Sequence, residues 1–138
     1  MKHAAQPAVG GVVLQSAVPV LLHLDHRRLE GQFEAADLDV AGHGASMFRF
    51  DLALAKAWGA VGMGASSRVL MQRANDNPNF FVSLSAPSAG KFLPQTGAVV
   101  IKDASGQIIG AVGASGGTGD EDEAICIAGV EAAGLAHG

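Results

Sequence analysis

The chain has few of the residues that usually strengthen a small domain. Its 138 residues include one cysteine, one tryptophan, six phenylalanines and no tyrosine. A single cysteine excludes an internal disulfide, and Cys126 lies in an apolar helical run, so we interpret it as a small buried hydrophobe in a reducing compartment. The formal net charge of −4 and the lack of a Lys/Arg run argue against nucleic acid or an anionic membrane surface as the main partner.

Glycine and alanine take the place of the missing aromatic residues. The nineteen glycines allow backbones to pack closely, but small side chains bury little apolar area per residue. A chain of this length supports one domain with one core. Because surface shared between copies would supplement a thin core, we predict a homo-oligomer.

The beginning of the chain has the least regular pattern. An apolar run over residues 8–22 is interrupted by Gly10, Gly11 and Pro19, and a charged cluster that is a poor cleavage region follows it. This does not fit a signal peptide, so we predict a cytoplasmic protein. We expect an irregular or shortened segment over residues 1–17 and a single folded domain over residues 18–138.

The first half of the domain predicts a hairpin followed by an apolar helix. Residues 18–25 are mainly β-branched or aliphatic, and residues 32–37 alternate loosely as a partner strand. Residues 50–61 favour a helix that is apolar on nearly every face, as expected for a helix packed between two layers. Lys56 is the single basic residue of this helix. It must meet a strand carbonyl or a remote carboxylate, or else contact an acidic group of a ligand.

The middle of the chain predicts another helix and a third strand. Ser66 is of the type that caps helix N-termini, so we expect a short helix from there through residue 74. The sequence Asn-Asp-Asn-Pro at residues 75–78 would stop it. Residues 80–84, Phe-Phe-Val-Ser-Leu, are rich in strand formers and predict a third strand.

The stretch from residue 97 to residue 129 has the clearest pattern. Two β-rich apolar runs, at 99–101 and 108–112, flank a short turn and predict a hairpin. A glycine-rich loop follows, and Thr118 with Glu121 has the spacing of a capping box at the start of a helix that extends to residue 135. The acids that surround Glu121 suit the positive end of that helix.

Other interpretations of the loop and of the histidines are weaker. Residues 113–117 fit Gly-x-Ser-x-Gly, but a catalytic triad would need a later histidine, and only His137 follows, next to the C-terminus. The glycine spacing does not match a dinucleotide-binding loop. The loop amides could still face an anion, although the acids behind them oppose this. The five histidines lack the spacing of a closed zinc site, so we predict no metal site.

Two segments resemble the GlcG/HbpS-like family, which is often described as haem-degrading and includes the C-terminal domain of PduO-type corrinoid adenosyltransferases. Residues 108–117 end in Ser-Gly-Gly and are followed by Asp122 and an Ala-rich helix, which is similar to the family's signature. Residues 51–61 resemble its Ala-x-x-Lys-Ala helix. The resemblance implies an α+β, profilin-like fold, with a central antiparallel sheet of about five strands flanked by helices. It also implies binding of haem or another small molecule.

The resemblance further implies a site between the glycine-rich loop and the apolar helix, at a subunit interface, with haem as the candidate cofactor. His43 lies in a glycine-flanked loop and is the candidate axial ligand. The predicted cofactor-binding residues are His43, Asp37, Ser115, Gly116 and Gly117. The predicted ionisable groups of the site are Lys56, Asp122 and Asp39.

The chain also departs from the family's pattern. Where the family has an Arg-Met-Asp-Gly-Ala type motif, residues 36–41 keep an acid and lose the arginine, so that arginine's role does not transfer. Two hypotheses of other classes also stay open. One is a small isomerase, lyase or tautomerase that acts on an organic acid or carbonyl compound, with Lys56 and Asp122 or Asp39 as catalytic acid and base. The other is an oligomeric accessory protein without a ligand.

Overall fold

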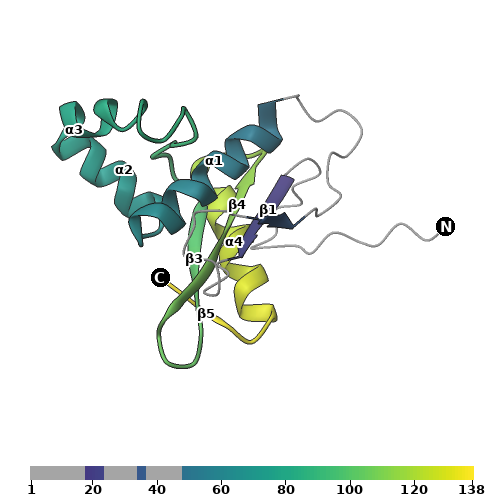
Figure 1. The fold of residues 1–138 in the computed structure, drawn as a ribbon. Helices are drawn as coiled ribbons and strands as arrows, with labels where there is room; N and C mark the ends of the chain where they lie inside the picture. Colours follow the sequence, from purple (N-terminus) through teal and green to yellow (C-terminus); the bar gives the residue numbers. More distant parts are fainter. Residues whose placement is uncertain (1–17, 24–33, 37–47) are drawn as a thin grey trace.

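The computed structural model describes residues 18–23, 34–36 and 48–138. In chain order the elements are β1 (Val18–His23), β2 (Glu34–Ala36), α1 (Phe48–Met63), α2 (Ser67–Asp76), α3 (Pro78–Ser83), β3 (Ala98–Lys102), β4 (Ile108–Ser115), α4 (Gly119–Ala132) and β5 (Ala136–His137). Within these ranges the strands form one antiparallel sheet of order β2-β1-β4-β3-β5 (Figure 1).

Helices α1 and α4 lie on opposite sides of strands β3 and β4 (Figure 1). Alternate residues of a strand point to opposite faces, so Ala98 and Val100 of β3 pack in the cluster that contains α1. Val99 and Ile101 pack in the other cluster, with α4. The predicted α+β fold, with an antiparallel sheet flanked by helices, is confirmed.

Small residues allow α1 to approach the sheet closely. Ala53, Ala57 and Ala60 of α1 are fully buried, as is Ala111 of β4. A Cβ atom added to Gly113 of β4 would lie 2.4 Å from the carbonyl oxygen of Ala53. The helix therefore rests directly on the strand's backbone, which explains why the sequence has glycine and alanine in both segments.

The two predicted hairpins are present, and the sheet joins them. Strand β1 pairs with β2 and also with β4, so β4 lies between β1 and β3. The predicted apolar helix is α1, which extends two residues further at each end than the expected range of 50–61. Helix α4 ends at Ala132, three residues before the expected end, and the chain then forms β5.

The predicted strand over residues 80–84 is wrong, because most of these residues lie in α3. Pro78 occupies the first turn of α3, where its missing N–H leaves no helical hydrogen bond unmade. Phe81 of the same helix is buried, and its ring centroid lies 5.8 Å from that of Phe92. The sheet is completed instead by β5, which pairs with Ile101 and Lys102 of β3.

Two serine hydroxyls bind the part of the β3 edge that β5 does not reach. Ser66 is the N-cap residue of α2, as predicted, but its side chain makes no capping bond and accepts a hydrogen bond from the Val100 amide at 3.0 Å. The Ser67 hydroxyl accepts from the Ala98 amide at 2.8 Å and donates to the Ala98 carbonyl at 3.1 Å. These bonds satisfy backbone groups that a neighbouring strand would otherwise pair with.

Candidate functional site

Lys56 of α1 and Asp122 of α4 form a buried ion pair. The lysine Nζ atom lies 3.0 Å from Asp122 Oδ2, and the two side chains are 9% and 2% exposed. Because α1 and α4 lie on opposite faces of the sheet, the pair connects the two helical layers.

Each member of the ion pair also binds a backbone group: that of Lys56 lies near the end of β4, and that of Asp122 lies just after β4. Lys56 Nζ donates to the Ala114 carbonyl at 3.1 Å. Asp122 Oδ1 accepts from the Gly117 amide at 3.0 Å. Ser115 lies between these two backbone groups in the chain. Of the two interpretations of Lys56, contact with a strand carbonyl and a remote carboxylate is the one that the structure contains.

Gly97, just before β3, leaves the space in which the ion pair forms. A Cβ atom on Gly97 would lie 2.7 Å from Lys56 Nζ and 3.0 Å from the Cβ of Asp122. Its φ of +127° is also a conformation that residues with side chains rarely adopt. The role of Gly97 was not predicted from the sequence, because a single glycine before a strand does not show which side chains will approach it.

The turn between β4 and α4 is exposed at the surface but uses its amides internally. Ser115 is only 6% exposed, whereas Gly117 and Thr118 are exposed. The predicted capping box is confirmed: Thr118 Oγ1 accepts from the Glu121 amide at 3.3 Å, and Glu121 Oε2 accepts from the Thr118 amide at 2.7 Å. The amides of Gly117, Thr118 and Glu121 thus bind this chain's own acceptors, which gives no support to an anion site at those amides.

Arg68 of α2 binds Asp120 and Glu123 at the start of α4, a contact that was not predicted from the sequence. Its guanidinium group donates to Asp120 and, at 2.8 Å from Nε, to Glu123. These hydrogen bonds raise the pKa of Arg68, although its side chain is half exposed. The uninterrupted acidic run at residues 120–123 was the signal for a basic partner from elsewhere in the chain.

Cys126 lies on α4, one helical turn after Asp122. Its side chain is almost fully buried, and its Sγ atom lies 3.5 Å from the Gly97 carbonyl oxygen, to which it donates. Burial, and secondarily the negative charge of Asp122, raise the pKa of the thiol to about 12. The thiol is therefore protonated at neutral pH, which fits the interpretation of Cys126 as a small buried residue and not as a reactive nucleophile.

The structure brings some of the predicted site residues together and does not describe others. Lys56, Asp122 and Gly117 are joined by hydrogen bonds. Ser115, the last residue of β4, and Gly116 lie between the two backbone groups that the pair binds. Asp37, Asp39 and His43 lie outside the described residues.

Two kinds of feature are absent from the described part of the chain. Its histidine, cysteine and acidic side chains form no group of three that could hold a metal ion. None of its helices is both long enough and apolar enough to cross a membrane.

The structure is an α+β domain with an antiparallel sheet between helices. The Lys56–Asp122 ion pair joins the helices on its two faces. The family model of the haem degrading protein HbpS-like family matches residues 38–131. The chain therefore belongs to the HbpS-like family, as the two sequence motifs predicted.

Solved structures show the same fold at low sequence identity. The crystal structure of the PduOC–haem complex has a TM-score of 0.68 and 21% identity, covering 87% of this chain and 80% of that chain. A double mutant of HbpS from Streptomyces reticuli has a TM-score of 0.63 and 22% identity, covering 86% and 71%. Protein ORFY of Klebsiella pneumoniae has a TM-score of 0.61 and 21% identity, covering 83% and 74%. No curated protein matches the chain.

Proposed function

We propose that this protein binds haem or a related small cofactor. The observation that carries the proposal is the match of the HbpS-like family model to residues 38–131. The similarity of the fold to PduOC, a protein solved in complex with haem, supports it. In this proposal the ligand contacts the exposed turn after β4, on the side of the turn that faces away from the ion pair.

The described residues fit this role in part. Protein ligands to haem iron are usually histidine, methionine, cysteine or tyrosine. Cys126 is protonated and bonded to Gly97, while Lys56 and Asp122 are bonded to each other. Over the described ranges, every buried side-chain nitrogen or oxygen has a hydrogen-bond partner. We propose, from its glycine-flanked position in the sequence, that His43 would ligate the iron, and that the turn at Gly116 and Gly117 would contact the ligand's surface.

We do not propose the proton-transfer enzyme, because the geometry of its two central residues does not favour it. A general acid or base must reach the substrate within hydrogen-bond distance. Lys56 and Asp122 are both buried, and each is bonded to the other and to a backbone group. A substrate would have to displace those bonds, so a role in holding the turn fits the pair better than a role in proton transfer.

Haemin titration tests the proposed function. We expect the Soret band to shift and to saturate at about one haemin per chain, because His43 coordinates the iron. The variant His43→Ala should alter the spectrum of the bound form. The matched control is His137→Ala, in β5, which should leave it unchanged. A wild-type protein whose Soret band stays that of free haemin at stoichiometric concentration would contradict the proposal.

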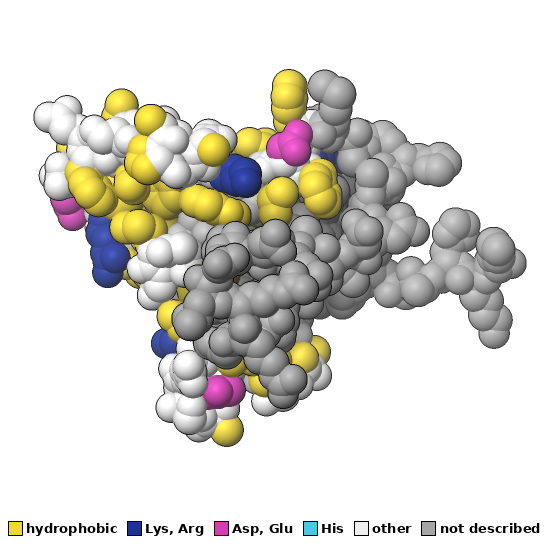
Figure 2. All heavy atoms as spheres, in the orientation of Figure 1, with side chains coloured by type: hydrophobic (Ala, Val, Ile, Leu, Met, Phe, Trp, Pro, Cys, Tyr) yellow, Lys and Arg dark blue, Asp and Glu magenta, His cyan; other side chains and the backbone are white. Residues whose placement is uncertain are grey.

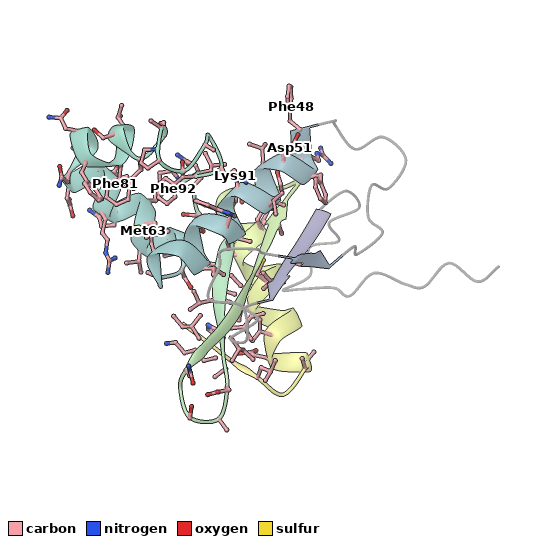
Figure 3. All side chains as sticks on the ribbon, in the orientation of Figure 1. Phe48, Asp51, Met63, Phe81, Lys91 and Phe92 are labelled. Carbon is pink, nitrogen blue, oxygen red and sulfur yellow. The ribbon has the colours of Figure 1, made fainter. Side chains whose placement is uncertain are left out.

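We also propose that copies of this chain associate through the start of α1, which brings the ligand to a subunit interface. Phe48, Phe50 and Leu52 are 63%, 42% and 41% exposed. Figure 3 shows Phe48 pointing away from the sheet, and Figure 2 shows hydrophobic side chains at the surface of this part of the molecule. Phe48 and Leu52 lie one turn apart on the same face of α1, and Phe50 lies on another side of the helix. Exposed apolar side chains that share a face commonly mark interaction surfaces.

Light scattering tests the association. The expected mass of the wild type is a multiple of the 13.9 kDa chain. Phe48→Ser should lower that mass, because it removes apolar area from the interface. Val82→Ser is the control, since Val82 is 72% exposed on α3, away from the start of α1. A wild-type mass of one chain would contradict the proposal.

A further inference from the structure

We infer that the Lys56–Asp122 ion pair positions the exposed turn after β4 for ligand binding, so that both are positioning residues and not ligand contacts. The inference rests on the proposed function, because it assumes that this turn contacts the ligand. Whether or not a ligand binds, the conformation of the turn is fixed by the ion pair and not by the sequence of the turn.

The first support is that the ion pair makes a hydrogen bond on each side of the start of the turn. Lys56 binds the Ala114 carbonyl, and Asp122 binds the Gly117 amide. These two groups bracket Ser115 and Gly116. If the turn moved, a buried charge would lose one of its partners, and buried charges without partners are strongly unfavourable.

The second support is that Gly116 and Gly117 have few other restraints, because the sheet pairing of β4 with β1 ends at Ser115, opposite Val18. These glycines have no Cβ atom and can adopt many backbone conformations at low cost. The capping box fixes Thr118, where α4 begins, but makes no bond to the residues before it. The bonds from the ion pair restrain Gly116 and Gly117, which lie between the end of β4 and Thr118.

The third support is the space left for the pair at Gly97. This residue lies outside the turn, in the segment before β3, yet a Cβ atom there would contact both Lys56 Nζ and the Cβ of Asp122. Adding one methyl group at Gly97 should therefore separate the two charged groups without removing either of them. This gives a way to disturb the geometry of the pair while keeping its chemistry.

Amide hydrogen exchange tests the effect on the turn. In Gly97→Ala, and in Asp122→Ala, we expect the Gly117 amide to exchange at least about tenfold faster than the loss of global stability accounts for, because its acceptor is displaced or removed. Amides in the middle of α4, such as that of Cys126, should accelerate only as much as the loss of global stability requires. The control is Gly129→Ala, also on α4, where an added Cβ meets nothing within 4 Å. Equal acceleration at all amides, or no change at Gly117, would overturn the inference.

Haemin affinity then tests the connection to the ligand. For Gly97→Ala, which keeps Lys56 and Asp122, we expect affinity to fall by about tenfold or more, while Gly129→Ala binds like the wild type. Undiminished affinity in Gly97→Ala, together with faster exchange at Gly117, would overturn the positioning role and leave the proposed function standing. A wild type that does not bind haemin would overturn the proposed function, and hydrogen exchange alone would then decide whether the pair fixes the turn.

Discussion

Replacing Lys56 with methionine is expected to lower the free energy of unfolding by about 3 to 5 kcal/mol, because it leaves the Asp122 carboxylate buried without its cation. Urea denaturation followed by circular dichroism measures the change. The matched control is Lys91→Met, since Lys91 is exposed. We expect that control to change stability by no more than about 0.5 kcal/mol.

The double variant Lys56→Met, Asp122→Leu separates the loss of attraction from the burial of an unpartnered charge. Replacing a whole buried pair with apolar residues is often close to neutral. We therefore expect the double variant to be more stable than Lys56→Met alone. If Lys56→Met costs less than about 1 kcal/mol, or if adding Asp122→Leu destabilises the protein further, the pair contributes less to the fold than we infer.

Substituting alanine for Gly113 is expected to destabilise the protein by about 3 kcal/mol, at the upper end of the range for overpacking. The added Cβ would lie 2.4 Å from the backbone oxygen of Ala53, and no side-chain rotation can relieve that contact. Helix α1 would have to move away from β4. Thermal and urea unfolding both measure the loss.

Gly62→Ala is the control for this prediction, because Gly62 lies on α1, the helix that Gly113 packs against, and an added Cβ there has nothing within 4 Å. Alanine favours the helical conformation over glycine, so we expect a gain of about 0.5 to 1 kcal/mol. Equal effects of Gly113→Ala and Gly62→Ala would mean that α1 does not rest on β4 as closely as the structure describes.

Local patterns predicted the features of the fold that depend on neighbouring residues. The final hairpin follows from two apolar runs around a turn, and the capping box follows from the spacing of Thr118 and Glu121. Helix α1 follows from its composition. The motifs around Lys56 and Asp122 also indicated the family, since they carry the resemblance that the family model confirms.

Features set by distant contacts could not be predicted in the same way. Residues 80–84 contain strand formers, but Phe81 packs against Phe92 and Pro78 starts a helix. Propensity is a weak guide when tertiary contacts oppose it. The role of Gly97 depends on two helices on opposite faces of the sheet, and no spacing along the chain contains that information.

The serines at the start of α2 also restrict how copies of this chain can meet. The hydroxyls of Ser66 and Ser67 bind the N–H and C=O groups of Ala98 and the N–H group of Val100, and β5 pairs with the next two residues of β3. A strand from another molecule therefore finds no open row of donors and acceptors along β3, and the two-residue β5 outside it is too short a template for pairing. On this side of the sheet, fibre-like growth by strand addition is blocked, and assembly is expected to proceed through helical surfaces.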